Sequence, residues 1–157
     1  MLLPFFKACE ASVIGETIRG SFWLFPAIEA VHLIALSIIG GAVLLVDLQL
    51  LGFGLQDQPI RNIARNAQPW LIGSLLMMIT TGLLLFFAES VKCYYSDAFW
   101  FKMSSLALAI LFAFTVRRWV TLADEARVGP VWSKVTGLVS LALWFGVGAG
   151  GRWIGFS

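Results

Sequence analysis

Residues 66–88 contain no charged side chain, and this run constrains the fold more than any other feature of the chain. About 20 consecutive apolar residues span the hydrocarbon core of a bilayer as one helix. The composition agrees, because 59% of the residues are hydrophobic, only 13% are charged and the mean hydropathy is +0.87. A soluble domain carries about 25% charged residues. The sequence therefore predicts an integral membrane protein in a lipid bilayer.

Three further segments resemble this run in length and character. We predict spanning helices at about residues 25–51, 67–89, 98–120 and 132–153. Pro26, Pro69 and Pro130 mark helix starts, because the first turn of a helix does not need the missing N–H. The fold class is therefore all-α, an integral membrane four-helix bundle in which residues 1–157 form a single transmembrane domain.

Residues 1–20 are expected to form a short amphipathic interfacial helix, since two apolar clusters alternate with charged side chains. A loosely ordered tail is the alternative. Tryptophan favours the membrane–water interface, and six of the seven are expected there: Trp23, Trp70, Trp100, Trp119, Trp132 and Trp153.

Four spans place both termini on one side of the membrane. Basic residues favour the cytoplasmic side, and those that set the orientation here are Arg61, Arg65, Arg117 and Arg118. The termini are then expected outside the cytoplasm. Cys9 and Cys93 would share that side, where either a disulfide or two free thiols is possible. The net charge of +2 does not suggest a nucleic-acid partner.

The first spanning segment carries three ionisable residues, Glu29, His32 and Asp47. Steps of three and four join them through Leu36, Gly40 and Val43, so we expect one inward-facing stripe. Ionisable side chains at membrane depth normally have a partner or a function.

Structural ion pairs explain two of these side chains. Asp47 lies near the inner end, where Arg117 and Arg118 of the third helix also lie, and the three are expected to form a structural ion pair. Glu29 and Lys102 lie near the outer end and form a second natural pair.

His32 is the only histidine, and three interpretations remain for it. It is a neutral, hydrogen-bonded side chain, an axial ligand to haem or another metal, or a proton relay with Glu29. The Glu29-x-x-His32 spacing also occurs in di-iron bundles, but one copy per chain does not complete such a site.

A haem bound between the helices would explain more of the residues near His32 than the other interpretations do. Gly40 would leave room for a macrocycle, and Trp144 lies at the depth of His32 and would wall the pocket. Lys102 or Arg152 would hold the propionates. The sixth ligand would be absent, come from another subunit or be a methionine, the candidates being Met77, Met78 and Met103.

Small residues recur on the fourth helix at Ala142, Gly146 and Gly150, which permits close helix packing. This seam faces the bundle interior or a second copy in a homo-oligomer. Motifs of soluble enzymes, such as a phosphate loop or a nucleophile elbow, are absent from the sequence.

The run from Trp23 to His32, followed by Gly40-Gly41 and by Asp47-Leu48-Gln49-Leu50-Leu51-Gly52, resembles a family of small bacterial inner-membrane proteins of unknown function. Pro69-Trp70, Thr81-Gly82 and Phe99-x-x-Lys102 continue the pattern, which covers residues 23–114. Gln49 departs from it, since the family is expected to have arginine there. The resemblance implies a bacterial inner (plasma) membrane location, with both termini periplasmic in the orientation above.

The layout is more distantly similar to the membrane protoporphyrinogen oxidase family and to the copper-resistance membrane family. That resemblance implies His32 as an axial ligand and Lys102 as a propionate or substrate contact. Our first hypothesis is a haem-b-binding redox or electron-transfer protein with a lipid-soluble partner such as quinone, or another membrane redox partner. Glu29 would be a further contact of the haem or of His32. Whether the chain is an enzyme stays open. The alternatives are an accessory subunit of a membrane complex and a small proton-coupled carrier that uses Glu29, His32 and Asp47.

Overall fold

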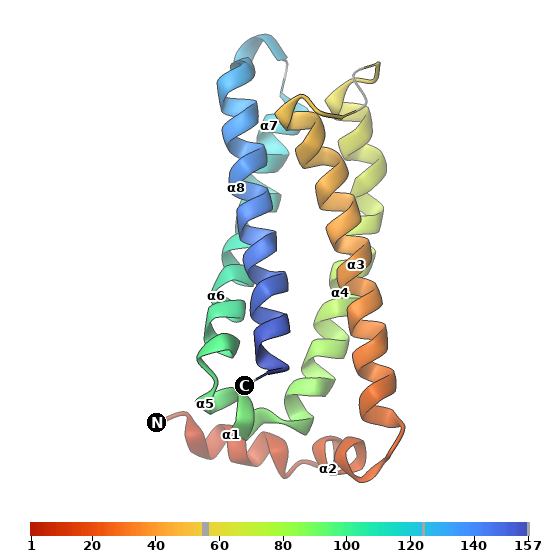
Figure 1. Cartoon of the computed structure of the whole chain (residues 1–157), viewed down its shortest axis with the longest axis vertical. Coiled ribbons are helices and arrows are strands. Elements are labelled where there is room, and N and C mark those ends of the chain that lie inside the picture. Colours follow the sequence, from red (N-terminus) through yellow and green to blue (C-terminus); the bar gives the residue numbers. More distant parts are fainter. Residues whose placement is uncertain (55–56, 124, 157) are drawn as a thin grey trace.

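The computed structural model describes residues 1–54, 57–123 and 125–156, and it is an all-α bundle, as the sequence predicts (Figure 1). Two short helices, α1 (Leu3–Glu10) and α2 (Val13–Gly20), lie across one end of the bundle. The first two spanning helices are α3 (Leu24–Leu51) and α4 (Ile60–Ala88). A short helix, α5 (Ser90–Tyr95), leads into the third span, which comprises α6 (Asp97–Phe112), the π-helical turn η1 (Ala113–Arg117) and α7 (Arg118–Leu122). The last span is α8 (Glu125–Ile154).

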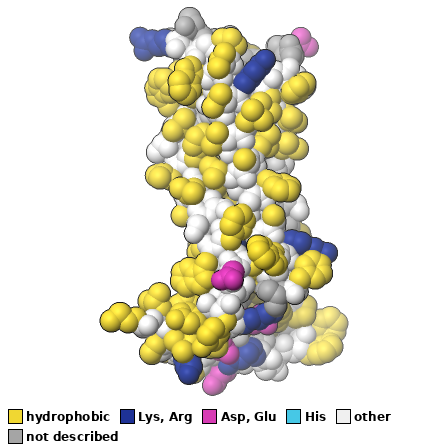
Figure 2. Space-filling model, turned by 60° about the vertical axis from the view of Figure 1, so that its left-hand side comes forward, with side chains coloured by type: hydrophobic (Ala, Val, Ile, Leu, Met, Phe, Trp, Pro, Cys, Tyr) yellow, Lys and Arg dark blue, Asp and Glu magenta, His cyan; other side chains and the backbone are white. Residues whose placement is uncertain are grey.

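Each of the four spans is long and apolar enough to cross a membrane. Hydrophobic side chains cover the length of the bundle in Figure 2, whereas charged side chains gather mainly toward its two ends. The six tryptophans expected at the interfaces are all exposed. Five of them lie near helix ends, whereas Trp70 lies inside α4. Such a surface has lipid rather than water as its natural solvent.

The N-terminal segment is ordered, but as two helices where the sequence suggests one. The break falls at Ser12, whose hydroxyl caps α2. Hydrogen bonds tie the pair to the bundle: Ser90 Oγ donates to the carbonyl of Phe6 (2.7 Å), Arg19 donates to the carbonyl of Ala88 (2.9 Å), and the Val91 N–H donates to Glu10 Oε2 (2.7 Å). These contacts close one end of the molecule.

The prediction that Pro69 starts the second helix is wrong. The helix begins at Ile60, with Pro59 at its N-cap, and Pro69 lies inside it. The backbone N–H groups in the first turn of a helix need partners outside the helix, and water supplies them at the membrane interface. A polar first turn is therefore tolerated, and α4 begins before the apolar segment. Pro130 behaves as expected: it follows a kink at Gly129, whose φ of 69° suits glycine.

The π-helical turn η1 controls which side chains of the third span face inward. In an α-helix each step of four residues advances about 40° beyond a full turn. Ala109, Ala113 and Arg117 would therefore drift apart around the axis. The wider turn over 113–117 removes part of this drift, and all three are buried.

Gly146 and Gly150 of the small-residue seam of α8 pack on α6, whereas Ala142 is exposed and lines a groove between α3 and α8. A Cβ added at Gly146 would lie 3.2 Å from Ser105 Oγ, and one added at Gly150 would lie 2.9 Å from the Cβ of Lys102. The seam thus brings α8 against the lysine that the sequence singles out.

Buried aliphatic side chains hold the centre of the bundle. Ile39 and Val43 of α3 and Val147 of α8 are almost completely buried, and Trp144 belongs to the same cluster. Of the two alternatives for the cysteines, the structure has the free thiols.

Candidate functional site

A cavity of about 390 Å³ lies between α4 and α6, with α3 behind it and α1 at its end. Twelve residues line it: Phe6, His32, Met78, Ile79, Gly82, Leu83, Phe86, Phe99, Trp100, Lys102, Met103 and Leu106. Ten of these are apolar side chains or glycine, and two, His32 and Lys102, are ionisable. The Lys102 side chain also runs beside α8, where its Nζ would lie 3.4 Å from a Cβ added at Gly151. A mostly apolar wall with a few polar groups is typical of a ligand site.

His32 is held by a threonine on the neighbouring helix. Its Nδ1 lies 2.9 Å from Thr81 Oγ1, and the same hydroxyl lies 2.8 Å from the carbonyl of Met77 and 3.2 Å from that of Met78. When the hydroxyl donates to a carbonyl, Thr81 Oγ1 accepts from Nδ1–H. A neutral ring in this arrangement carries its proton on Nδ1 and a lone pair on Nε2. This is the tautomer of a metal-ligating histidine whose other nitrogen is fixed by a hydrogen bond.

Gly82 makes this arrangement sterically possible. A Cβ added there would lie 3.2 Å from Cε1 of His32, a tighter approach than side-chain carbons normally make. Any larger residue would push the imidazole away from α4.

Lys102 is the only cation that lines the cavity, and within the described ranges no carboxylate forms a salt bridge with it. Of the other residues considered for a haem site, Met78 and Met103 line the cavity. Met77 and Arg152 do not, and Arg152 instead lies over the ring of Phe156 at 4.7 Å.

The cavity opens sideways toward the lipid. Leu83 and Met103 line it, yet their side chains are 54% and 43% exposed. Phe6 of α1 closes the end near the membrane surface and is buried against the rings of Phe86, Tyr94 and Trp100. A ligand would therefore reach His32 through the gap between α4 and α6.

Glu29 does not join this site. It is exposed on α3, and no hydrogen bond or ion pair to it is found among the described residues, so the expected pair with Lys102 does not form. The buried stripe of α3 instead includes Ala35, Ile39 and Ala42, because other helices cover that side. Steps of three and four residues from His32 reach Ala35 and Ile39 as readily as Leu36 and Gly40. The spacing alone therefore did not decide which of the two stripes faces inward.

Trp144 and Gly40 also lie elsewhere. Both line a separate apolar groove of about 740 Å³ between α3 and α8. The glycine that makes room beside the histidine is thus Gly82, on α4, and the aromatic walls of the cavity are Phe86, Phe99 and Trp100.

Asp47 and Arg117 meet near the opposite end of the bundle. Arg117 Nε donates to Asp47 Oδ1 at 2.8 Å, and both side chains are buried. Arg118 is exposed and does not take part. Asp47 Oδ2 and the nearby Ser140 Oγ are buried without a hydrogen bond among the described residues. The pair links α3 to η1, as a structural role requires.

The donor set suits a group that brings most of its own ligands. No cluster of three or more histidine, cysteine or acidic side chains that would bind a bare metal ion occurs in residues 1–54, 57–123 and 125–156. Haem iron is already held by the porphyrin and needs only an axial ligand such as Nε2 of His32. The cavity lies toward the lower end of the roughly 300–1,000 Å³ range of ligand sites, and its side opening extends it.

Thr81, Gly82 and Phe6 are the contributors that the sequence did not assign to the site. Thr81-Gly82 was visible only as a step in a family pattern, and Phe6 lies far from His32 in sequence. The structure brings the Thr-Gly step, His32 and Lys102 to one cavity.

A family model described as "Family of unknown function (DUF6644)" matches residues 5–157. No curated protein and no solved structure matches the chain.

Proposed function

Because this chain belongs to DUF6644, a family of unknown function, we propose its activity from its own site: it binds haem b through His32 and exchanges electrons with a lipid-soluble partner of the quinone class. The observation that carries the proposal is a histidine that lines a mostly apolar cavity and is oriented by Thr81. With the hydrogen bond from Nδ1–H to Thr81 Oγ1 formed, Nε2 is the nitrogen left to bind a ligand.

The remaining lining residues have complementary roles. Lys102 offers an ammonium group to a carboxylate, which is the charge a haem propionate carries. Phe86 and Phe99 stack on one another at 5.8 Å and present a flat aromatic wall to a ring. Met78 or Met103, which line the same cavity, would supply a second protein ligand. When bound, haem supplies one-electron redox chemistry that no amino-acid side chain here provides.

The side opening supports a partner from the bilayer. Leu83 and Met103 expose their side chains at the mouth of the cavity, so an apolar molecule dissolved in lipid meets the site without crossing water. Quinones have this solubility and carry carbonyl oxygens that accept hydrogen bonds. Electron exchange at this mouth is the second half of the proposal.

An absorption spectrum tests the first half. The protein purified after expression with ample haem should show a Soret band, and His32→Gly should lose it. Exogenous imidazole should restore the band in His32→Gly, because the missing side chain leaves space for it beside Thr81. Met77→Leu, a change on the exposed face of α4, is the control and should keep the band. Absence of the band from the unmodified protein would contradict the proposal.

The proton-carrier alternative finds less support. It needs Glu29, His32 and Asp47 in communication, but Glu29 is exposed. His32 and Asp47 are 15 residues apart, about 22 Å along the helix, and Ile39 and Val43 fill the space between them with aliphatic side chains. An accessory subunit would purify with a stable partner and without a Soret band.

A further inference from the structure

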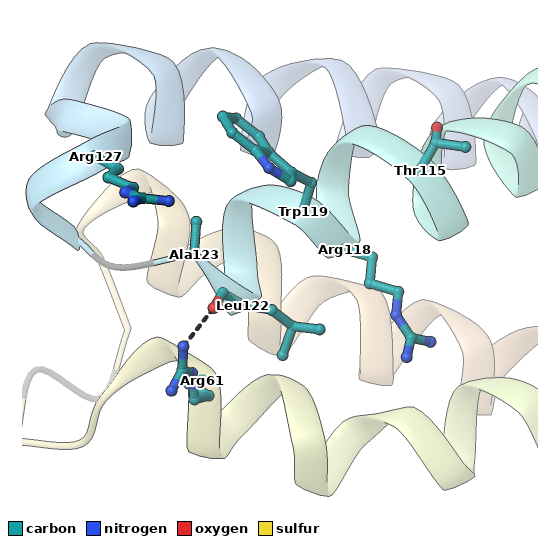
Figure 3. Close-up of a pocket in the computed structure, with 7 residues that line it drawn as sticks. All are labelled: Arg61, Thr115, Arg118, Trp119, Leu122, Ala123 and Arg127. Atoms are coloured by element: carbon teal, nitrogen blue, oxygen red, sulfur yellow. Dashed lines mark hydrogen bonds between the residues drawn. The ribbon is translucent and has the colours of Figure 1, made fainter.

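We propose a second ligand site, at the end of the bundle farther from His32, that holds the phosphate of an anionic phospholipid. A surface hollow of about 470 Å³ lies there between the ends of α4, α7 and α8 (Figure 3). Its lining residues are Arg61, Thr115, Arg118, Trp119, Leu122, Ala123 and Arg127. The proposal does not depend on haem or on His32.

The hollow lies at the level of lipid headgroups. Arg61 is in the first turn of α4, Leu122 ends α7 and Arg127 lies near the start of α8, so all three mark the ends of membrane spans. Trp119 lines the hollow with 63% of its side chain exposed. Tryptophan in this position is characteristic of the membrane–water interface.

Three guanidinium groups border the hollow, and no acidic side chain is among the described residues that line it. Arg61 donates to the carbonyl of Leu122, which fixes its position at the rim (Figure 3). Arg118 and Arg127 are exposed. Arginine binds phosphate through paired N–H donors, and basic pockets between spanning helices bind anionic lipid headgroups.

The depth of the hollow favours a lipid over a soluble anion. Thr115 is seven residues before Leu122, about 10 Å deeper along the helix. Beyond Thr115 the same span exposes Leu111 and Leu108, which are 63% and 55% exposed. An acyl chain would lie along this apolar surface, while its phosphate stays among the arginines.

Binding of phosphatidylglycerol to the full-length protein in detergent, followed by native mass spectrometry, tests the site. Each lost positive charge should weaken binding about fivefold. The double variant Arg118→Gln with Arg127→Gln should therefore weaken binding on the order of twentyfold. Each single variant should lose about fivefold. The control is Arg65→Gln with Lys134→Gln, which removes the same charge from the same end, outside the hollow. The control should change the affinity less than twofold.

Two further measurements identify the source of the phosphate. Phosphatidylcholine should bind at least tenfold more weakly than phosphatidylglycerol, and millimolar inorganic phosphate should not displace the bound lipid. Equal loss of binding in the test and control variants would overturn the proposal, since only diffuse charge would then matter. Displacement by inorganic phosphate would also overturn it, in favour of a site for a soluble anion.

Discussion

His32 acquires its proposed chemistry from one hydroxyl group rather than from its depth in the membrane. Depth alone is compatible with several states of a histidine ring. The Thr81 hydroxyl is close to both Nδ1 and the Met77 carbonyl, so it can donate to the carbonyl while it accepts from Nδ1–H. In that arrangement a single side chain leaves Nε2 as the nitrogen that binds a ligand.

Thr81→Val therefore provides the most specific test at the scale of a residue. Valine keeps the shape but removes the acceptor for Nδ1–H, so unfolding should become easier by about 1–3 kcal/mol. The Soret band proposed above should weaken as well. Thr80→Val is the matched control, since Thr80 is exposed and, within the part of the chain that the structure describes, its hydroxyl bonds only to the carbonyl of Leu76. Thermal unfolding in bicelles measures both, and equal effects of the two variants would argue against the role of Thr81.

Cys93 offers a second test at this scale. Burial, with a smaller contribution from the Glu89 carboxylate, raises the pKa of the Cys93 thiol to about 11. The thiolate is the reactive form, so at pH 8 about one molecule in a thousand is reactive. In Cys9→Ser protein, the alkylation rate with iodoacetamide should rise about tenfold per pH unit between pH 7 and 10. A plateau near pH 9, where an ordinary thiol titrates, would show that Cys93 is not buried in this way.

The spanning helices were the easiest features to predict from the sequence, whereas their starts and internal irregularities were harder to predict. Uncharged runs of about 20 residues have few alternatives in a membrane, which is why all four spans were predicted within a few residues, apart from the starts of the second and fourth. The error at Pro69 arose because proline is tolerated inside a helix as well as at its start. A π-helical turn has no characteristic amino-acid composition, so residues 113–117 gave no indication of η1.

The seam between α6 and α8 gives a prediction at the scale of elements. Gly150→Ala would place a Cβ within 2.9 Å of the Cβ of Lys102, so the helices must separate. We expect a loss of about 1–3 kcal/mol in the free energy of unfolding, as for other overpacked interfaces. Gly148→Ala, with open space around its added Cβ, is the control. Unfolding in bicelles by sodium dodecyl sulfate measures the difference, and indistinguishable curves would contradict the close approach.

At the scale of the whole molecule, polar side chains are separated into two ends by an aliphatic middle. His32 and Lys102 lie toward the end closed by α1, whereas Asp47 and Arg117 lie toward the other. The sequence identified all four residues, since ionisable groups stand out in apolar segments. It also assigned them to the same two ends. Its error was to turn Glu29 toward His32 and Lys102, because helical spacing alone does not reveal which faces the other helices cover.

The buried ion pair should behave as one unit that fastens α3 to η1. Asp47→Leu or Arg117→Met alone leaves a buried charge without its partner, and each should destabilise the protein by about 3–5 kcal/mol. The double variant should recover most of this loss. Arg118→Met, at an exposed neighbour, should change stability by less than about 0.5 kcal/mol. Additive losses in the double variant, measured by unfolding in bicelles, would show that the two side chains act independently.

Closure of the cavity by Phe6 has a consequence for how its occupancy is measured. Since the mouth faces lipid and the water side is shut, the site samples the bilayer concentration of a ligand rather than its concentration in the buffer. A half-saturation point should then be expressed as molecules per lipid. Adding empty lipid at constant protein and constant total ligand will dilute the ligand and lower occupancy, even though the volume of the sample has not changed.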